Sequence, residues 1–68
     1  MKISYFSDTD TALIEFSGRT TDETREITEN ILFDLDSEGN PVSLTIEHAS
    51  ELADLPDISF KQVGKESA

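Results

Sequence analysis

Two short polar stretches carry the aspartates of this chain that are best placed to bind a metal ion. Asp8 and Asp10 stand in the cluster 7–11. Asp34 and Asp36 open a second polar stretch. If both stretches are turns that meet at one end of a sheet, their carboxylates form a cluster that can hold a divalent ion, and such an ion can serve hydrolysis. Polar residues also dominate turns that bind nothing, because they satisfy local backbone groups. We therefore expect solvated turns with no metal or cofactor; a divalent-metal-binding protein or a small metal-dependent enzyme is the alternative.

The second stretch is similar to the start of a calcium-binding loop. Asp34, Asp36 and Gly39 fit the spacing D-x-D-x-x-G. The last position of an EF-hand loop, however, is a bidentate glutamate between helices, whereas here it falls on Thr45 between strand-like segments. A polar hairpin turn is the better interpretation.

The other residue types that support catalysis do not form a recognisable pattern. His48 is the single histidine and the chain has no cysteine. No second histidine or cysteine is therefore present to share a metal ion with His48 or to act with it in nucleophilic catalysis. The serines include no G-x-S-x-G turn, and Gly18, Gly39 and Gly64 are too scattered for a phosphate-binding loop. We expect a structural or surface role for His48 and favour a protein that is not an enzyme.

A β-hairpin is predicted at the centre of the chain. Apolar residues alternate over 31–35 and again over 42–47, as in half-buried strands. The polar residues 36–38 suit a tight turn, and Gly39 supplies the positive φ that closes such loops. The residues predicted to share the apolar sides of the two strands are Ile31, Phe33, Leu35, Val42, Leu44 and Ile46.

Three further strands are predicted before this hairpin. Residues 1–5 and 12–17 alternate on either side of the cluster 7–11, which predicts a first hairpin. Residues 24–28 contain one large apolar residue and fit a short strand at a sheet edge, where charges discourage unwanted pairing.

A short helix is predicted after the last strand. Ser50 is a suitable N-cap for a helix over residues 50–55. Leu52 and Leu55, with Ala49, would lie against one face of the sheet, and Pro56 would end the helix.

The predicted fold class is α+β: an antiparallel β-meander of four to five strands with one short C-terminal helix. We expect residues 1–55 to form a single domain, and 56–68 to form a tail with a weak extra strand at 57–63 followed by disorder. One short helix cannot cover both faces of such a sheet. Leu13 and Leu32 are expected on the face away from the main apolar side, so neither face is wholly polar.

The charge balance limits the possible partners. The chain of 68 residues has fifteen acidic and five basic residues, a net charge of −10. This charge repels nucleic acid and anionic membranes and attracts basic proteins. The sequence contains no apolar run of membrane length and no pattern of a signal peptide, so we expect a cytoplasmic protein. A domain this small, without disulfides, is only marginally stable alone, which favours association with another chain.

Three stretches together resemble a family of small prokaryotic proteins, the domain of unknown function (DUF) family 2283. They match its M-K-I-x-Y opening, its Y-x4-D-x3-I-x-[LF] spacing and its central pattern that ends in A-S. The resemblance implies a compact β-meander with a short C-terminal helix. The chain is also similar to the small acidic proteins that are encoded beside toxin-like partners, and this similarity suggests an antitoxin-like role. The matching residues after the opening are Tyr5, Asp10, Ile14, Phe16, Asp34, Asp36, Gly39, Val42, Ile46, Ala49 and Ser50.

The expected function is that of a non-enzymatic, acidic protein-interaction module that binds a basic protein. Glu23, Glu26 and Glu29, on or beside the third strand, are predicted to face this partner. Leu13 and Leu32 are predicted to contact a second chain, in a homo-oligomer or a heterocomplex. A structural subunit of a homo-oligomer is a further alternative.

Overall fold

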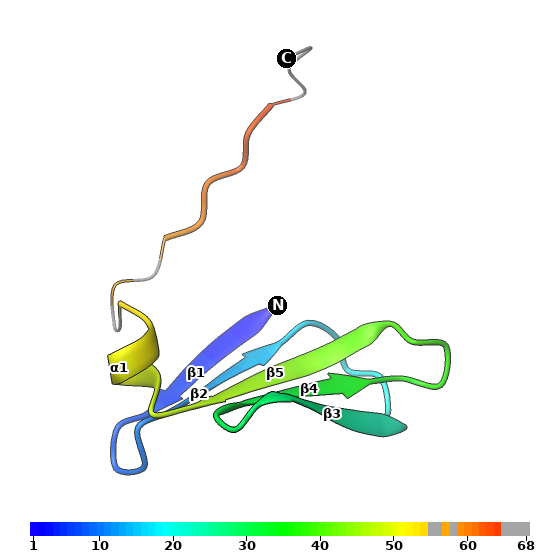
Figure 1. Ribbon diagram of the computed structural model, residues 1–68. Coiled ribbons are helices and arrows are strands. Elements are labelled where there is room, and N and C mark those ends of the chain that lie inside the picture. Colours follow the sequence, from blue (N-terminus) through cyan, green and yellow to red (C-terminus); the bar gives the residue numbers. More distant parts are fainter. Residues whose placement is uncertain (55–56, 58, 65–68) are drawn as a thin grey trace.

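The computed structural model describes residues 1–54, 57 and 59–64, and shows one antiparallel sheet of five strands with a short helix at one end (Figure 1). The predicted fold, an antiparallel β-meander with one short C-terminal helix, is confirmed. The elements are β1 (Lys2–Phe6), β2 (Thr11–Glu15), β3 (Glu23–Thr28), β4 (Ile31–Leu35), β5 (Pro41–Glu47) and α1 (Ala49–Leu52).

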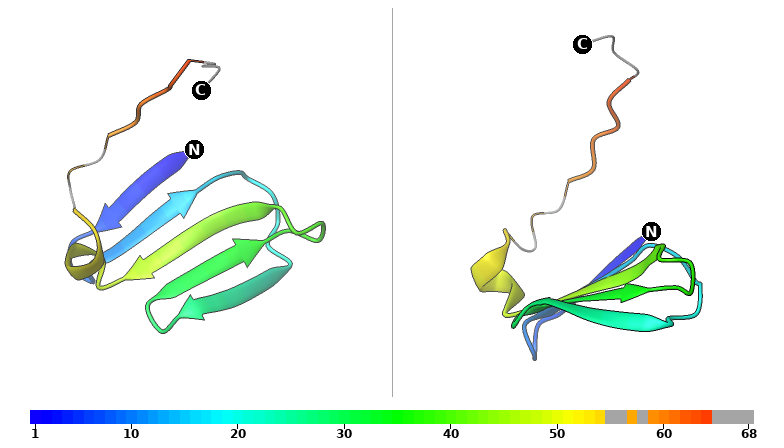
Figure 2. Two further views of the ribbon diagram at one scale, coloured as in Figure 1. Left: turned by 45° about the horizontal axis from the view of Figure 1, so that its top comes forward. Right: turned by 45° about the vertical axis from the view of Figure 1, so that its right-hand side comes forward.

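The strand order is β1-β2-β5-β4-β3, which makes β5 the central strand (Figure 2). The strands β3, β4 and β5 follow one another as a meander, and the β1–β2 hairpin pairs with the free side of β5. The link 16–22 therefore carries the chain past β5 and β4 to the far edge of the sheet. The predicted edge position of β3 is confirmed, and β1 forms the other edge.

The central hairpin closes as its residue types predict. Gly39 has φ of 83°, in the region that favours glycine, and its amide donates to the carbonyl of Asp36 at 3.1 Å. The Asp36 amide in turn donates to the carbonyl of Asn40 at 2.9 Å. The register between β4 and β5 shifts by one residue at the end of β4. Leu35 therefore lies opposite Pro41 and not opposite Val42.

The register divides the sheet into two different faces. On one face, which we call the apolar face, two rows of apolar side chains cross β1, β2, β5 and β4. The reverse face carries one row that is polar throughout, a second row that contains both Leu13 and Leu32, and a shorter row of Phe6, Thr11 and Glu47. On the apolar face, the first row is Ile3, Ile14, Leu44 and Phe33, and the second row is Tyr5, Ala12, Ile46 and Ile31. On the reverse face, the polar row is Lys2, Glu15, Ser43, Asp34 and Thr24. The row with the two leucines is Ser4, Leu13, Thr45, Leu32 and Glu26.

The buried core is thin. The buried apolar residues among those described are Ala12, Leu35, Val42 and Ala49, and no large side chain of the described residues is fully buried. A single sheet layer with α1 over one end leaves most of the apolar face open to solvent, and Ile3 is 40% exposed.

The start of the helix differs from the prediction. Ser50 was expected to be the N-cap, but α1 begins at Ala49 and His48 occupies the cap position with φ 56° and ψ 42°. The Ser50 side chain does not cap its own helix because it hydrogen-bonds to Asp10, in the β1–β2 turn. Of the residues predicted to lie against the sheet, Ala49 is buried, whereas Leu52 is 53% exposed.

The C-terminal segment also differs. The helix ends at Leu52, earlier than the predicted residue 55, because Ala53 is already extended. Of the predicted strand over 57–63, the described residues, Asp57 and 59–63, form no helix or strand. Alternation produces a strand only where a neighbouring strand supplies hydrogen bonds, and none pairs with these described residues. Leu55, Pro56, Ile58 and the predicted disorder at 65–68 lie outside the described residues.

Candidate interaction surface

The two aspartate-rich turns lie at opposite ends of β5. Thr11, directly after Asp10, pairs with Glu47 at the end of β5, whereas the turn after Asp36 leads into Pro41 at its start. These ends are about 20 Å apart, because a strand rises about 3.3 Å per residue. The hypothesis that the two turns meet in one acidic cluster is therefore wrong. Across the described part of the chain, no group of three or more His, Cys, Asp or Glu is arranged to hold a metal ion.

Asp10 fastens the helix to the first hairpin. Its backbone has φ of 55°, and its carbonyl accepts the Ala49 amide at 2.9 Å. Its carboxylate accepts the Ser50 amide at 3.1 Å, the Ser50 hydroxyl at 2.8 Å and the Tyr5 hydroxyl at 2.6 Å. The hydrogen bonds from Tyr5 and Ser50 lower the pKa of the Asp10 carboxyl, because they stabilise its charged form. We call this set, Tyr5, Asp10, Ala49 and Ser50, the clamp.

The clamp is not arranged for acid–base chemistry. The hydrogen bond to Asp10 raises the pKa of Tyr5, because the phenol would lose that bond and meet a like charge on ionising. Tyr5 is thus a weaker acid than a free tyrosine, and Asp10 a weaker base than a free aspartate. Both changes run against a role as general acid or base near neutral pH.

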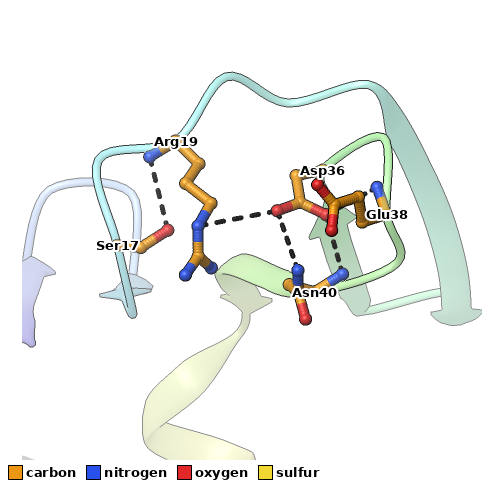
Figure 3. A network of polar contacts seen from close by, with 5 residues as sticks. All are labelled: Ser17, Arg19, Asp36, Glu38 and Asn40. Atoms are coloured by element: carbon orange, nitrogen blue, oxygen red, sulfur yellow. Dashed lines mark hydrogen bonds and ion pairs between the residues drawn. The ribbon is translucent and has the colours of Figure 1, made fainter.

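Asp36 holds the central turn (Figure 3). Its carboxylate accepts the backbone amides of Asn40 and Glu38 at 2.8 and 2.9 Å, and the Asn40 side-chain amide at 3.2 Å. The guanidinium of Arg19 approaches the same carboxylate at 3.6 Å, which ties the link 16–22 to the hairpin. The Asn40 backbone hydrogen bond is the main cause that lowers the pKa of Asp36.

Asp34 and Asp8 serve neither a calcium loop nor a shared site. Asp34 lies on the reverse face, where it accepts the Thr24 hydroxyl at 2.6 Å and the Ser43 hydroxyl at 2.7 Å. It therefore joins the side chains of β3, β4 and β5 across one row of the sheet. Asp8 is exposed in the β1–β2 turn. The calcium-loop alternative fails because the carboxylates of Asp34 and Asp36 are directed to different partners within the fold.

The three glutamates predicted to face a partner do not share a surface. Glu23 shares a row with Leu35 and binds Arg25 at 2.7 Å. Glu26 lies on the reverse face, opposite Leu32. Glu29 lies in the β3–β4 turn, directly after β3 ends at Thr28.

The two leucines predicted for a second contact do lie together. Leu13 and Leu32 occupy one row of the reverse face, with Thr45 of β5 between them. Their separation is about 10 Å, twice the spacing of neighbouring strands. Both are half-buried.

A groove of about 350 Å³ lies over the β1–β2 end of the apolar face, and we call it the acidic groove. Its floor is formed by Ile3, Ala12, Ile14 and Ile46 of the apolar face. Its wall is formed by Ala53, Asp54, Asp57 and Ser59, which follow α1. Sequence reasoning counted these two aspartates only in the total charge. The spacing of Ile3 and Ile14 in the first hairpin was the signal for the floor, but no local pattern places the wall above it.

A second hollow, of about 270 Å³, lies beside the helix. Its lining includes His48, whose Nδ1 is 3.0 Å from the side-chain oxygen of Asn30. This contact joins the cap of α1 to the β3–β4 turn, consistent with the expected structural role of His48. The remaining lining residues are Glu29, Glu51 and Leu52.

Comparison with known proteins connects the chain to one family. Residues 2–50 match the family described as "Protein of unknown function (DUF2283)". The match includes all five strands and the clamp, and it ends before the wall of the acidic groove. Neither a curated protein nor a solved structure matches the chain. Within the described residues, no helix has the length and apolar character needed to cross a membrane.

Proposed function

The chain belongs to the DUF2283 family of proteins of unknown function, and we propose that it is a non-enzymatic, antitoxin-like interaction module that binds a basic protein. In this role it neutralises a small basic partner by occupying the partner's cationic surface. We place the complex in the cytoplasm.

The uncovered apolar face is the observation that carries the proposal. Ile3 and Tyr5 are 40% and 36% exposed, and Ile14, Leu44 and Ile46 are only half-buried. A contiguous apolar surface of this kind marks an interaction site in a soluble protein, because removing it from water is favourable at about 25 cal/mol per Å². A partner that covers this face completes a core that the chain does not build alone.

The charge of the chain selects the kind of partner. A net charge of −10 on 68 residues steers basic proteins toward the surface and repels other acidic chains. Among the described residues, Asp54 and Asp57 lie above one edge of the open face, whereas Glu23 at the other edge is already paired with Arg25. An apolar centre with acidic surroundings complements a partner with an apolar centre and basic surroundings.

The roles of the aspartates support a non-enzymatic function. Asp10, Asp34 and Asp36 each accept two or more hydrogen bonds from side chains or amides that hold turns and strands. A general base or metal ligand must keep an oxygen directed at its substrate or ion. These carboxylates are instead used within the scaffold.

A pull-down from the source cell tests the proposal. The tagged chain is expected to recover a basic protein, and recovery is expected to fall steeply as salt is added, because salt screens the charges that attract the partner. The activity of the recovered protein should fall when the complex forms. Recovery that does not depend on salt contradicts the electrostatic recognition.

A structural subunit of a homo-oligomer is the second candidate. The row that contains Leu13 and Leu32 favours it, because a second chain can bury these two leucines on the reverse face. Light scattering at micromolar concentration distinguishes the two candidates. A stable homo-oligomer with no retrieved partner supports the second candidate, and a monomer that binds a basic protein supports the first.

A further inference from the structure

We propose that the acidic groove is the site where the basic partner docks an amphipathic segment, with apolar side chains on the floor and a lysine or arginine against Asp54 and Asp57. This inference rests on the proposed function and deepens it, because it names the surface and the chemistry of the segment that the surface accepts. The groove is defined by its floor and wall residues described above.

The floor of the groove suits apolar side chains. Ile3 and Ile14 are paired across β1 and β2, and Ala12 is paired with Ile46 across β2 and β5. Ala12 is the small residue in this set and is 2% exposed, so the larger isoleucines border a shallow depression above it. The volume of about 350 Å³ is at the lower end of the range of binding pockets and admits a few side chains, not a whole domain.

The wall of the groove suits a cation. Asp54 and Asp57 are exposed, and among the described residues neither forms an ion pair. Lysine and arginine place their methylene groups on apolar surface while their charged ends remain in a polar environment. A cationic side chain that enters this groove therefore contacts isoleucine along its stem and carboxylate at its end.

The alternative occupants fit the groove less well. A second copy of the chain brings another −10 charge toward two carboxylates that have no cation beside them in the described structure. Nucleic acid and anionic lipid are repelled for the same reason. The reverse face offers Phe6, Leu13 and Leu32, but Thr45 separates the two leucines and a fully polar row lies beside them, so this face presents no continuous apolar floor.

Titration with a synthetic probe tests the assignment. The probe is an amphipathic helix of leucine and lysine, with leucine at helical spacing and lysine elsewhere. A helix with glutamate in place of lysine is its control. With the isotope-labelled full chain, the amide resonances of Ile3, Ile14, Ile46 and Ala53 are expected to shift with the lysine probe and not with the glutamate probe.

Matched variants distinguish the groove from the general charge. The double change Asp54→Asn and Asp57→Asn is expected to weaken probe binding about tenfold, which is equivalent to about 1.4 kcal/mol. The control is the double change Glu15→Gln and Glu38→Gln, which removes the same amount of charge from the reverse face and the central turn. It is expected to weaken probe binding less than twofold, which is equivalent to under about 0.4 kcal/mol.

A second pair of variants tests the floor. Ile3→Thr keeps a β-branched residue on the edge strand β1 and is expected to weaken binding several-fold, because it removes apolar contact. Ile27→Thr makes the same change on the other edge strand, β3, where Ile27 is 55% exposed, and is expected to have no effect.

Three results would overturn the assignment. The first is that the two double substitutions, at Asp54 with Asp57 and at Glu15 with Glu38, weaken probe binding equally. The second is that the resonance shifts centre on Leu13 and Leu32. The third is that a second copy of the chain already covers the floor residues in the free protein. In the first two cases a basic partner recovered in the pull-down leaves the proposed function intact and moves the docking site elsewhere. Absence of a basic partner in the pull-down, with groove-specific binding of the probe, contradicts the proposed function and not the chemistry of the groove.

Discussion

The carboxylate of Asp10 accepts the hydroxyl hydrogen bond of Ser50, 40 residues further along the chain, at 2.8 Å. This contact joins the first turn of the protein to its only described helix. Together with the Tyr5 hydroxyl and the Ala49 amide, it sets where the chain leaves the sheet and enters the segment that walls the acidic groove. The clamp is therefore structural, but the proposed docking site depends on it.

Loss of the clamp is expected to loosen the helix while the sheet remains folded. In Ser50→Ala the carboxylate of Asp10 loses one of its donors, so amide hydrogen exchange should become faster over Ala49–Leu52 and remain unchanged in β4 and β5. Ser37→Ala, in the exposed central turn, is the control and should leave exchange in the helix unchanged. Equal exchange in both variants would show that the helix does not depend on the clamp.

Acid is expected to weaken the fold through Asp10 and Asp36. The pKa of each carboxyl is lowered in the folded chain from its ordinary value of 3.8, so the stabilisation is present above that value and is lost as pH falls from it toward the folded pKa. Relief of the mutual repulsion of the acids acts in the opposite direction over the same range. Urea unfolding followed against pH measures the balance.

The contribution of Asp36 can be isolated by substitution. Asp36→Asn should be less stable than the natural chain near neutral pH, and its stability should fall less on acidification, because one of the carboxyls with a lowered pKa is gone. Glu38→Gln removes one acid from the same turn while the backbone amide that binds Asp36 stays. A Glu38→Gln chain with the same flattened acid profile as Asp36→Asn would contradict the assigned cause.

Tyr5 is the single tyrosine, so its ionisation can be followed directly by phenolate absorbance. Its pKa is raised above 10.0 by the hydrogen bond to Asp10. The corresponding stabilisation is present below that value and is lost as pH rises through the folded pKa. Asp10→Asn should bring the titration back toward 10.0, whereas Asp54→Asn should leave it unchanged. An unshifted titration in the natural chain would exclude the hydrogen bond in solution.

Gly39 is expected to tolerate substitution poorly for a conformational reason. A Cβ at this position meets no atom within 4 Å, but its φ of 83° is strained for other residues. Gly39→Ala should therefore lower the free energy of unfolding by about 1–2 kcal/mol, as measured in urea. Gly18→Ala also adds a Cβ in open space but without a positive φ, so it should be neutral or slightly stabilising. Equal effects of the two substitutions would contradict the backbone explanation.

Local features of the fold were predictable from the sequence because they depend on neighbours in the chain. Alternation of apolar residues predicts β4 and β5 at nearly their observed bounds, and the residue types at 36–39 predict the turn between them. The same alternation places Leu13 and Leu32 on the reverse face. The strand pattern at 57–63 failed because alternation does not report whether a neighbouring strand is present.

Tertiary structure alone decided which distant residues meet. Alternation does not specify strand order, so the pairing of β2 with β5 and the separation of the two aspartate-rich turns could not be read from it. Ser50 is a good N-cap by type, but its hydroxyl binds Asp10 because folding brings that carboxylate closer than its own helix terminus. The acidic groove likewise exists only because Asp54 and Asp57, which follow α1, lie beside Ile3 and Ile14 in the folded chain. Local periodicity sets the elements, whereas hydrogen bonds and contacts between elements far apart in the chain set the surfaces they form.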